Sequence, residues 1–137
     1  MNLLTAVNIN ASGLTAQRQR IEVVSENLAN SQTTRTQDGG PYQRKDVVFT
    51  TTSFAGEFNR AVEGVEVSEV VNDESAFERR FEPGHPDADA QGYVLYPNVN
   101  VMTEMANMMS ASRSYEANLA SIAVLKTMIQ KTLELGR

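Results

Sequence analysis

The sequence predicts an α+β fold in which long N- and C-terminal helices form an antiparallel, coiled-coil-like pair beside a small β-rich middle segment. Apolar residues recur at steps of three and four in residues 3–30 and 99–135, which is the period of an amphipathic helix. Between them, turn formers separate short stretches in which valines and aromatics alternate with polar residues, as is typical of strands. The predicted units are an N-terminal helix (1–30), a loop and β-rich segment (31–97) and a C-terminal helix (98–137).

The N-terminal helix is predicted from an apolar stripe, most of which repeats every seven residues, a pattern that favours a seam facing another helix. The stripe consists of Leu4, Val7, Leu14, Ile21 and Leu28. Gly13 interrupts the helix and costs about 1 kcal/mol relative to alanine, so the isolated helix should be marginally stable. Asn30 is a suitable left-handed C-cap at its end.

The middle segment is predicted to contain loops and short strands. Residues 35–60 include the turn signal at 38–41 and indicate a loop with one short strand at best. Alternating patterns at 65–71, 77–81 and 92–96 predict three short strands in one small sheet with one apolar face.

The C-terminal helix follows Pro97, with Asn98 or Asn100 as its N-cap. Its apolar stripe, which we expect to pack against the N-terminal stripe and against neighbouring molecules, consists of Met105, Met108, Tyr115, Leu119, Ile122, Ile129 and Leu133. A helix from 99 to 135 would be about 55 Å long, so much of it must project beyond a small sheet. Its methionines fit either plain packing or an adaptable partner-binding surface.

Composition excludes several classes of protein. A chain of 137 residues with 41% hydrophobic residues allows one domain with a modest core. No run of eighteen or more apolar residues exists, so we expect no membrane insertion. The first positive charge is Arg18, which argues against a cleaved secretory signal and leaves export by another route open. The absence of cysteine excludes disulfides, a thiolate zinc site and a cysteine nucleophile.

The net charge of −5 is concentrated in the middle of the chain. Residues 1–30 carry two arginines and two glutamates, and residues 98–137 carry four basic and three acidic side chains, which leaves −6 for residues 31–97. Nearly neutral helices can pack together without strong repulsion, whereas the acidic middle keeps a solvated face. This distribution disfavours a nucleic-acid partner.

His85 is the only histidine, and Asp87 and Asp89 follow it among turn-forming residues. A catalytic zinc site needs several such ligands, and the spacing around Asp87 matches a calcium loop only weakly. A hydrolase that uses His85 with either aspartate would lack a nucleophile elbow or a phosphate-binding loop. We therefore expect a local turn hydrogen bond at His85, and no catalytic residue, metal or cofactor.

Two segments carry a family resemblance besides their plain interpretation as a helix end and a small-residue helix face. The first is the run 27–30 followed by Thr33, and the second extends from 98–100 through 104–105 to the run 112–118. Both resemble the terminal signatures of the bacterial flagellar axial proteins, the rod and hook family. The matching residues are Asn27, Ala29, Asn30, Thr33, Arg113, Tyr115, Glu116 and Asn118.

Further segments narrow the resemblance to the rod protein C branch of that family, a proximal rod subunit. They lie at 33–36, 39–45, 83–90, 92–94 and 97–99, so the resemblance covers essentially the whole chain. The 67 residues of the middle segment, 31–97, are too few for the large outer domain of hook relatives.

The resemblance implies a structural subunit of the flagellar basal body, whose paired terminal helices assemble with other rod proteins and with copies of itself into a torque-transmitting shaft. It also implies unfolded export through the flagellar type III apparatus to the periplasm-spanning rod, without signal cleavage. The residues alone also allow a soluble helical adaptor or export chaperone that binds client helices.

Overall fold

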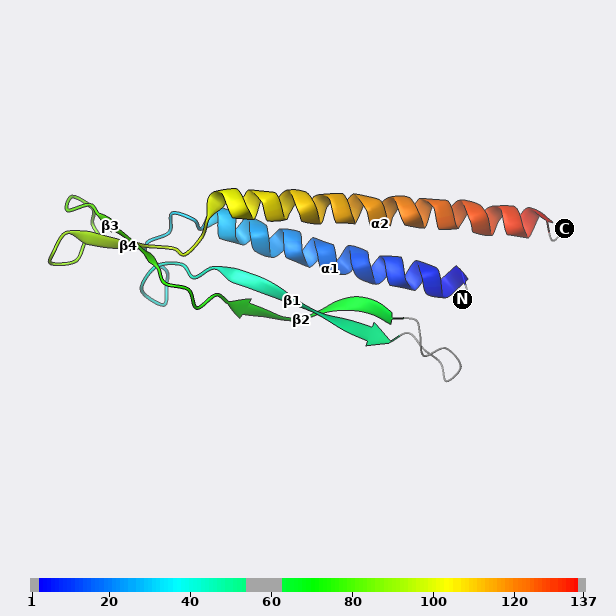
Figure 1. Cartoon of the computed structure of the whole chain (residues 1–137), viewed down its shortest axis with the longest axis horizontal. Helices are drawn as coiled ribbons and strands as arrows, with labels where there is room; N and C mark the ends of the chain where they lie inside the picture. Colours follow the sequence, from blue (N-terminus) through cyan, green and yellow to red (C-terminus); the bar gives the residue numbers. More distant parts are fainter. Residues whose placement is uncertain (1–2, 54–62, 136–137) are drawn as a thin grey trace.

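The computed structural model describes residues 3–53 and 63–135 and has two long helices and two small antiparallel sheets (Figure 1). The elements are, in order, α1 (Leu3–Ala29), β1 (Lys45–Ser53), β2 (Glu63–Asn72), β3 (Glu78–Phe81), β4 (Tyr93–Tyr96) and α2 (Val101–Leu135). The predicted α+β class, with terminal helices and a small β middle, is confirmed.

The two helices run antiparallel, and their register is constant along the pair (Figure 1). Asn27 bonds to Glu104, and Gly13 lies against Asn118. Asn27 and Gly13 are 14 residues apart, and so are Glu104 and Asn118, so α1 and α2 advance equally between these contacts. The same register places Leu3 opposite about residue 128 of α2, and the last two turns of α2, the overhang (residues 129–135), extend past α1.

The helix ends follow from their own side chains. Asn100 begins α2, because its Oδ1 accepts the backbone N–H of Thr103 at 3.1 Å, which is an N-cap. At the end of α1, Asn30 donates its backbone N–H and its side-chain Nδ2 to the carbonyl of Glu26. The predicted left-handed cap at Asn30 is wrong, since only glycines among the described residues have positive φ. A side-chain hydrogen bond stabilises this end instead.

β1 and β2 form a long hairpin rather than the predicted loop with one short strand. β1 has nine residues and pairs with β2 from Lys45↔Asn72 to Ser53↔Glu63, with a bulge after Val48. The threonines of β1 favour extended structure, and a full-length partner strand converts that preference into a ladder. The remainder of the predicted loop, 54–60, lies outside the described residues.

The prediction of one three-stranded sheet is also wrong. β3 pairs only with β4, from Glu78↔Tyr96 to Phe81↔Tyr93, and forms a separate two-stranded sheet. The intervening turns bring β3 and β4 together, and the backbone N–H of Glu82 donates to the carbonyl of Gly92 at 2.9 Å. Gly92 has φ +80°, and a Cβ there would meet Phe81 at 3.0 Å, so glycine is required at this crossing.

The helices and the β1–β2 hairpin form three layers with α1 in the middle (Figure 1). Among the described helices and strands, α2 packs only against α1, whereas α1 also contacts β1 and β2. The core is correspondingly thin. Its buried apolar side chains are Ala16, Val24, Tyr42, Val94, Tyr96 and Ala111. Neither described helix is apolar enough over a sufficient length to cross a membrane.

Candidate functional site: a polar junction and an uncovered helix face

A buried polar cluster joins the end of α1 to the start of α2, and Asn27 is its centre. We call it the polar junction and define it as Asn27, Tyr42, Arg44, Lys45 and Glu104. The Asn27 side chain is fully buried and makes all four of its hydrogen bonds. Its Nδ2 donates to Glu104 Oε2 at 2.9 Å and to the Lys45 carbonyl at 2.8 Å. Its Oδ1 accepts from the Tyr42 hydroxyl and the Lys45 backbone N–H, both at 2.9 Å.

Glu104 brings a buried charge into this cluster, and Arg44 neutralises it. The Glu104 side chain is only 1% exposed, and its Oε1 accepts from Arg44 Nε at 3.0 Å. Arg44 Nη1 also reaches Asp46 at 3.1 Å and Asp73 at 3.2 Å. A buried carboxylate needs such partners, because an isolated one would carry a large desolvation cost. Arg44 therefore connects α2 to both strands at the open end of the β1–β2 hairpin.

Tyr42 completes the junction, and its ionisation is suppressed there. Burial, followed by the nearby charges of Glu26 and Glu104, raises the pKa of Tyr42 to about 12. The phenol thus stays protonated at neutral pH and donates to Asn27. Lys45 closes the exposed side through an ion pair with Glu26 at 2.6 Å.

Asn98 holds the segment before α2 against the same junction. Its Oδ1 accepts the Arg44 backbone N–H at 2.8 Å, while its Nδ2 donates to the carbonyls of Asp73 and Ser75. Of the two predicted N-caps, Asn100 caps α2 and Asn98 fixes the loop. The polar junction and Asn98 together connect five segments of the chain: the end of α1, residues 42–46, residues 73–75, the segment before α2 and the start of α2.

The face of α2 that points away from α1 presents the opposite chemistry. Large apolar side chains remain uncovered along its whole length, with exposed fractions from 39% at Val101 to 89% at Leu135. We call this surface the outward face and define it as Met102, Met105, Met109, Val124, Met128 and Leu135. Steps of three and four residues place Met102, Met105 and Met109 along one side of the first half of α2, and steps of four and seven place Val124, Met128 and Leu135 along one side of its second half.

The predicted packing residues fall into two groups. Half-buried positions are Val7, Leu14, Ile21, Leu28, Met108, Tyr115, Ile122 and Ile129. Met105, Leu119 and Leu133 are 50%, 52% and 68% exposed, so they remain available for contacts outside the chain. The side chain of Leu4 lies outside the described part of the structure. The most buried positions of α1, namely Ala16, Val24 and Asn27, are not members of the predicted stripe.

The residues that carry the family resemblance also have distinct environments. Asn27 is the centre of the junction, and Thr33 Oγ1 donates to Asn30 Oδ1 at 3.2 Å just beyond α1. Asn118 fills the space that Gly13 leaves on α1, where a Cβ would lie 2.8 Å from its Nδ2. Ala29, Arg113 and Glu116 are exposed, and Tyr115 is half-buried.

Sequence reasoning did not identify Glu104 and Tyr42 as partners of Asn27, nor Arg44 as the partner of Glu104. Glu104 carries a weak signal, because it is the acidic residue in the first turn of α2. No sequence pattern places Arg44 or Tyr42 next to it, because 60 or more residues separate each of them from Glu104.

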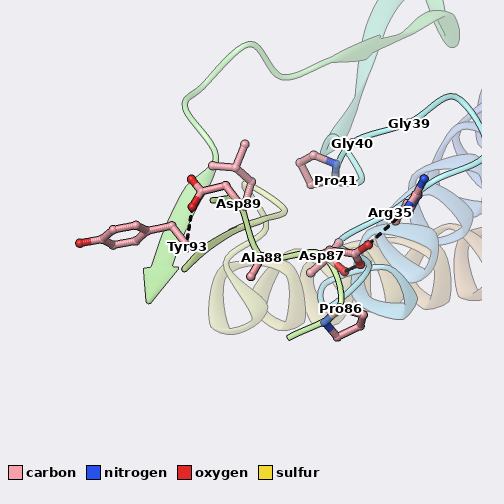
Figure 2. A pocket seen from close by; sticks show the side chains of 11 residues that line it. Arg35, Gly39, Gly40, Pro41, Pro86, Asp87, Ala88, Asp89 and Tyr93 are labelled. Carbon is pink, nitrogen blue, oxygen red and sulfur yellow. Dashed lines mark hydrogen bonds and ion pairs between the residues drawn. The ribbon is translucent and has the colours of Figure 1, made fainter. Parts of the chain in front are cut away.

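The turn around His85 borders an open cleft of about 450 Å³ between residues 34–41 and the β3–β4 sheet (Figure 2). His85 Nδ1 accepts the backbone N–H of Asp87 at 3.1 Å, which confirms the predicted local hydrogen bond. Asp87 bonds to Thr34 at 2.8 Å and pairs with Arg35 at 3.5 Å (Figure 2). The backbone N–H of Tyr93 lowers the pKa of Asp89. Within residues 3–53 and 63–135, no three histidines or carboxylates gather around a potential metal position.

Comparisons with known proteins agree on one family. Residues 7–36 match the family described as "Flagella basal body rod protein", and residues 90–135 match "Flagellar basal body rod FlgEFG protein C-terminal". The flagellar basal-body rod protein FlgC of Escherichia coli O6:H1 is 46% identical over 137 residues, covering all of both chains. FlgC of Borreliella burgdorferi is 42% identical over 147 aligned positions, covering 97% of each chain. FlgC of Bacillus subtilis is 41% identical over 150, covering all of both.

The matched segments coincide with α1 and its following loop and with β4 and α2. Of these elements, α1 and α2 are held together by the polar junction. Full-length identity above 40% to several relatives extends the match through the β-rich middle. This chain therefore belongs to the FlgC family of flagellar basal-body rod proteins.

Proposed function

We propose that this chain is a structural subunit of the flagellar basal-body rod that joins its neighbours through exposed apolar side chains of α2, namely those of the outward face and Leu119 beside it. The neighbours are other rod proteins and further copies of this chain. The subunit occupies the proximal rod, and the assembled shaft transmits torque. It reaches the rod through the flagellar type III export apparatus, without a cleaved signal peptide.

The exposed apolar side chains of α2 carry this proposal. Six residues of the outward face stay between 50% and 89% exposed, although apolar side chains of this size are normally buried. Exposed apolar surface of this kind marks a protein interface. Each such side chain gains about 1.5–3 kcal/mol on full burial, so assembly supplies free energy that the single chain lacks.

A thin core suits a protein that must unfold for export. α2 packs only against α1 among the described elements, and Gly13 weakens α1. Such helices have little stability when separated. The chain therefore crosses a narrow channel unfolded and forms its helix pair afterwards.

The subunit has no catalytic role. The candidate residues for a hydrolase were His85 with either Asp87 or Asp89. His85 makes a turn hydrogen bond, Asp87 contacts Thr34 and Arg35, and Asp89 pairs with Arg79. The cleft beside it has the character of an open surface depression between two loops (Figure 2).

Replacement of Leu119 by aspartate tests the assembly surface. Leu119 is 52% exposed, so Leu119→Asp should leave the circular dichroism of the isolated chain unchanged and abolish swimming. Ser121→Asp, at an exposed polar position two residues away, adds the same charge and should swim normally. Normal swimming by the Leu119 variant would remove this part of α2 from the interface.

Mass spectrometry of purified basal bodies tests the location. We expect the wild-type chain to be retained in the basal-body fraction, and the Leu119 variant to be absent from it. A soluble adaptor or export chaperone would instead form a small closed complex in the cytosol and be lost from that fraction.

A further inference from the structure

One row of facing residues in the helix pair carries no large apolar side chain that could specify the register. The residues of this row lie seven apart, at Gly13, Arg20 and Asn27 on α1 and at Glu104, Ala111 and Asn118 on α2. All six are buried or half-buried, all six are polar or lack a side chain beyond Cβ, and Arg20 bonds to Asn107 of α2. Specific apolar knobs, which usually fix a coiled-coil register, are missing from this seam.

A slip of α2 by one heptad is sterically acceptable along most of this seam. Such a slip, about 10 Å, would bring Ala111 opposite Asn27 and Leu125 opposite Gly13. Alanine fits any close helix contact, and a leucine finds room beside glycine. Among the described helices and strands α2 packs only against α1, so no strand contact resists the movement. At the junction end, the slip would also have to break the hydrogen bonds of Asn98, which holds the segment before α2.

The polar junction does not accept the slip. Opposite Ala111, the buried Asn27 Nδ2 would lose the Glu104 carboxylate that it contacts at 2.9 Å. Arg44, only 16% exposed, would lose the partner that accepts from its Nε at 3.0 Å. Buried donors without acceptors make the slipped state unfavourable.

We infer that the buried Asn27–Glu104 pair determines the register of α1 and α2, and thereby fixes which apolar side chains of α2 are displayed outward. The inference concerns the fold of the single chain and does not depend on the proposed assembly. Asn27 and Glu104 are positioning residues, and the Gly13–Asn118 contact is a secondary constraint on the same register.

Because the chain contains no cysteine, engineered cysteine pairs report the register directly. Ala6→Cys with Leu125→Cys probes the observed register, one heptad beyond Gly13 and Asn118. Ala6→Cys with Thr132→Cys probes the slipped one. Each pair is placed in the full chain, oxidised at low concentration, and the intramolecular disulfide is quantified by non-reducing electrophoresis and mass spectrometry.

In the otherwise native chain, we expect the 6–125 disulfide to form and the 6–132 disulfide to be scarce. Asn27→Leu should raise the ratio of slipped to native disulfide by about tenfold or more, the change that loss of one hydrogen bond to a buried charge produces. Asn10→Leu is the matched control, because the Asn10 amide bonds only to the Ala6 carbonyl within α1. It should leave the ratio unchanged.

Glu104→Gln distinguishes the need for a hydrogen-bond acceptor opposite Asn27 from the need for a negative charge. Glutamine retains an acceptor for Asn27, so this variant should keep the native register, whereas Glu104→Leu should slip. An unchanged ratio in both leucine variants would overturn the inference. Loss of helicity in both leucine variants would overturn it equally, since the pair would then be required for folding rather than for choice of register.

Discussion

The two ends of the helix pair differ in chemistry. Where α1 ends and α2 begins, buried polar groups satisfy one another in the polar junction, and the Asn27 and Glu104 side chains are shielded from solvent. At the other end, the overhang presents Leu133 at 68% and Leu135 at 89% exposure. The first end is satisfied within one chain, whereas the second leaves apolar side chains exposed. The chain thus separates the residues that define its fold from the apolar residues that we propose join it to other subunits.

Asn27→Ala should produce the largest effect and would test whether the junction dominates the fold. The change removes the hydrogen bonds that Asn27 makes to Glu104 Oε2, the Tyr42 hydroxyl and the Lys45 backbone, although Glu104 keeps its ion pair with Arg44. Each buried polar group left without a partner costs about 1–3 kcal/mol, so we expect a total loss of about 3–5 kcal/mol. Urea denaturation followed by circular dichroism measures the loss. A loss of stability no greater than that of Asn10→Ala would mean that the junction contributes no more to the free energy of unfolding than the rest of α1 does.

High pH should weaken the junction end through Tyr42. Its folded-state pKa of about 12 exceeds the ordinary value of 10.0, so the native state retains a proton that the unfolded state releases. The associated stability is fully present below pH 10 and is lost as the pH rises towards 12. The loss amounts to about 2–3 kcal/mol. Denaturation midpoints of the wild type and Tyr42→Phe should converge over this range, and a constant gap would contradict the coupling.

The Gly13–Asn118 contact should have an intermediate effect that appears only as coupling. In the Asn118→Ala background, Gly13→Ala should stabilise the chain by about 1 kcal/mol, because alanine is the better helix former. In the native background, the new methyl group must displace the Asn118 amide, so the gain should vanish. A double-mutant cycle in urea measures the difference. Additive effects would mean that Asn118 does not occupy this space in solution.

Leu133→Ala, in the overhang, should have the smallest effect. Its side chain is 68% exposed, so the free energy of unfolding should change by less than about 0.5 kcal/mol. The same measurement on Val24→Ala, whose side chain is 5% exposed on α1, should give a clear loss and serves as the contrast. A large cost at Leu133 would show that the overhang is covered within the chain.

The sequence predicted the fold class and both helices because amphipathic periods and caps are local properties. α2 begins at Val101, just after Asn100, and the patterns at 65–71, 77–81 and 92–96 are strands. Strand pairing was not predicted correctly, because the partner of β2 is set by contacts distant in sequence. The threonine-rich β1 has no alternating apolar pattern, and its length becomes evident only beside β2.

The candidate site was predictable in part for a similar reason. The family resemblance indicated the importance of Asn27 and Asn118. Helical spacing indicated that the methionines of α2 share a face that packs or binds a partner. The partners of Asn27 were not predicted, since Glu104 and Tyr42 reach it from other segments, through contacts that carry no sequence period. The predicted apolar stripe of α1 also differs from its most buried positions, Ala16, Val24 and Asn27. The reason is that α1 contacts α2 on one side and the β1–β2 hairpin on another.

The unequal lengths of the helices have a geometric consequence. With α1 beginning at Leu3 and α2 continuing to Leu135, the far end of the subunit is a step about 10 Å high rather than a flat surface. In the shaft that we propose, the overhang of one subunit would lie beside the body of a neighbouring subunit, and contacts at such steps would oppose twisting of the shaft.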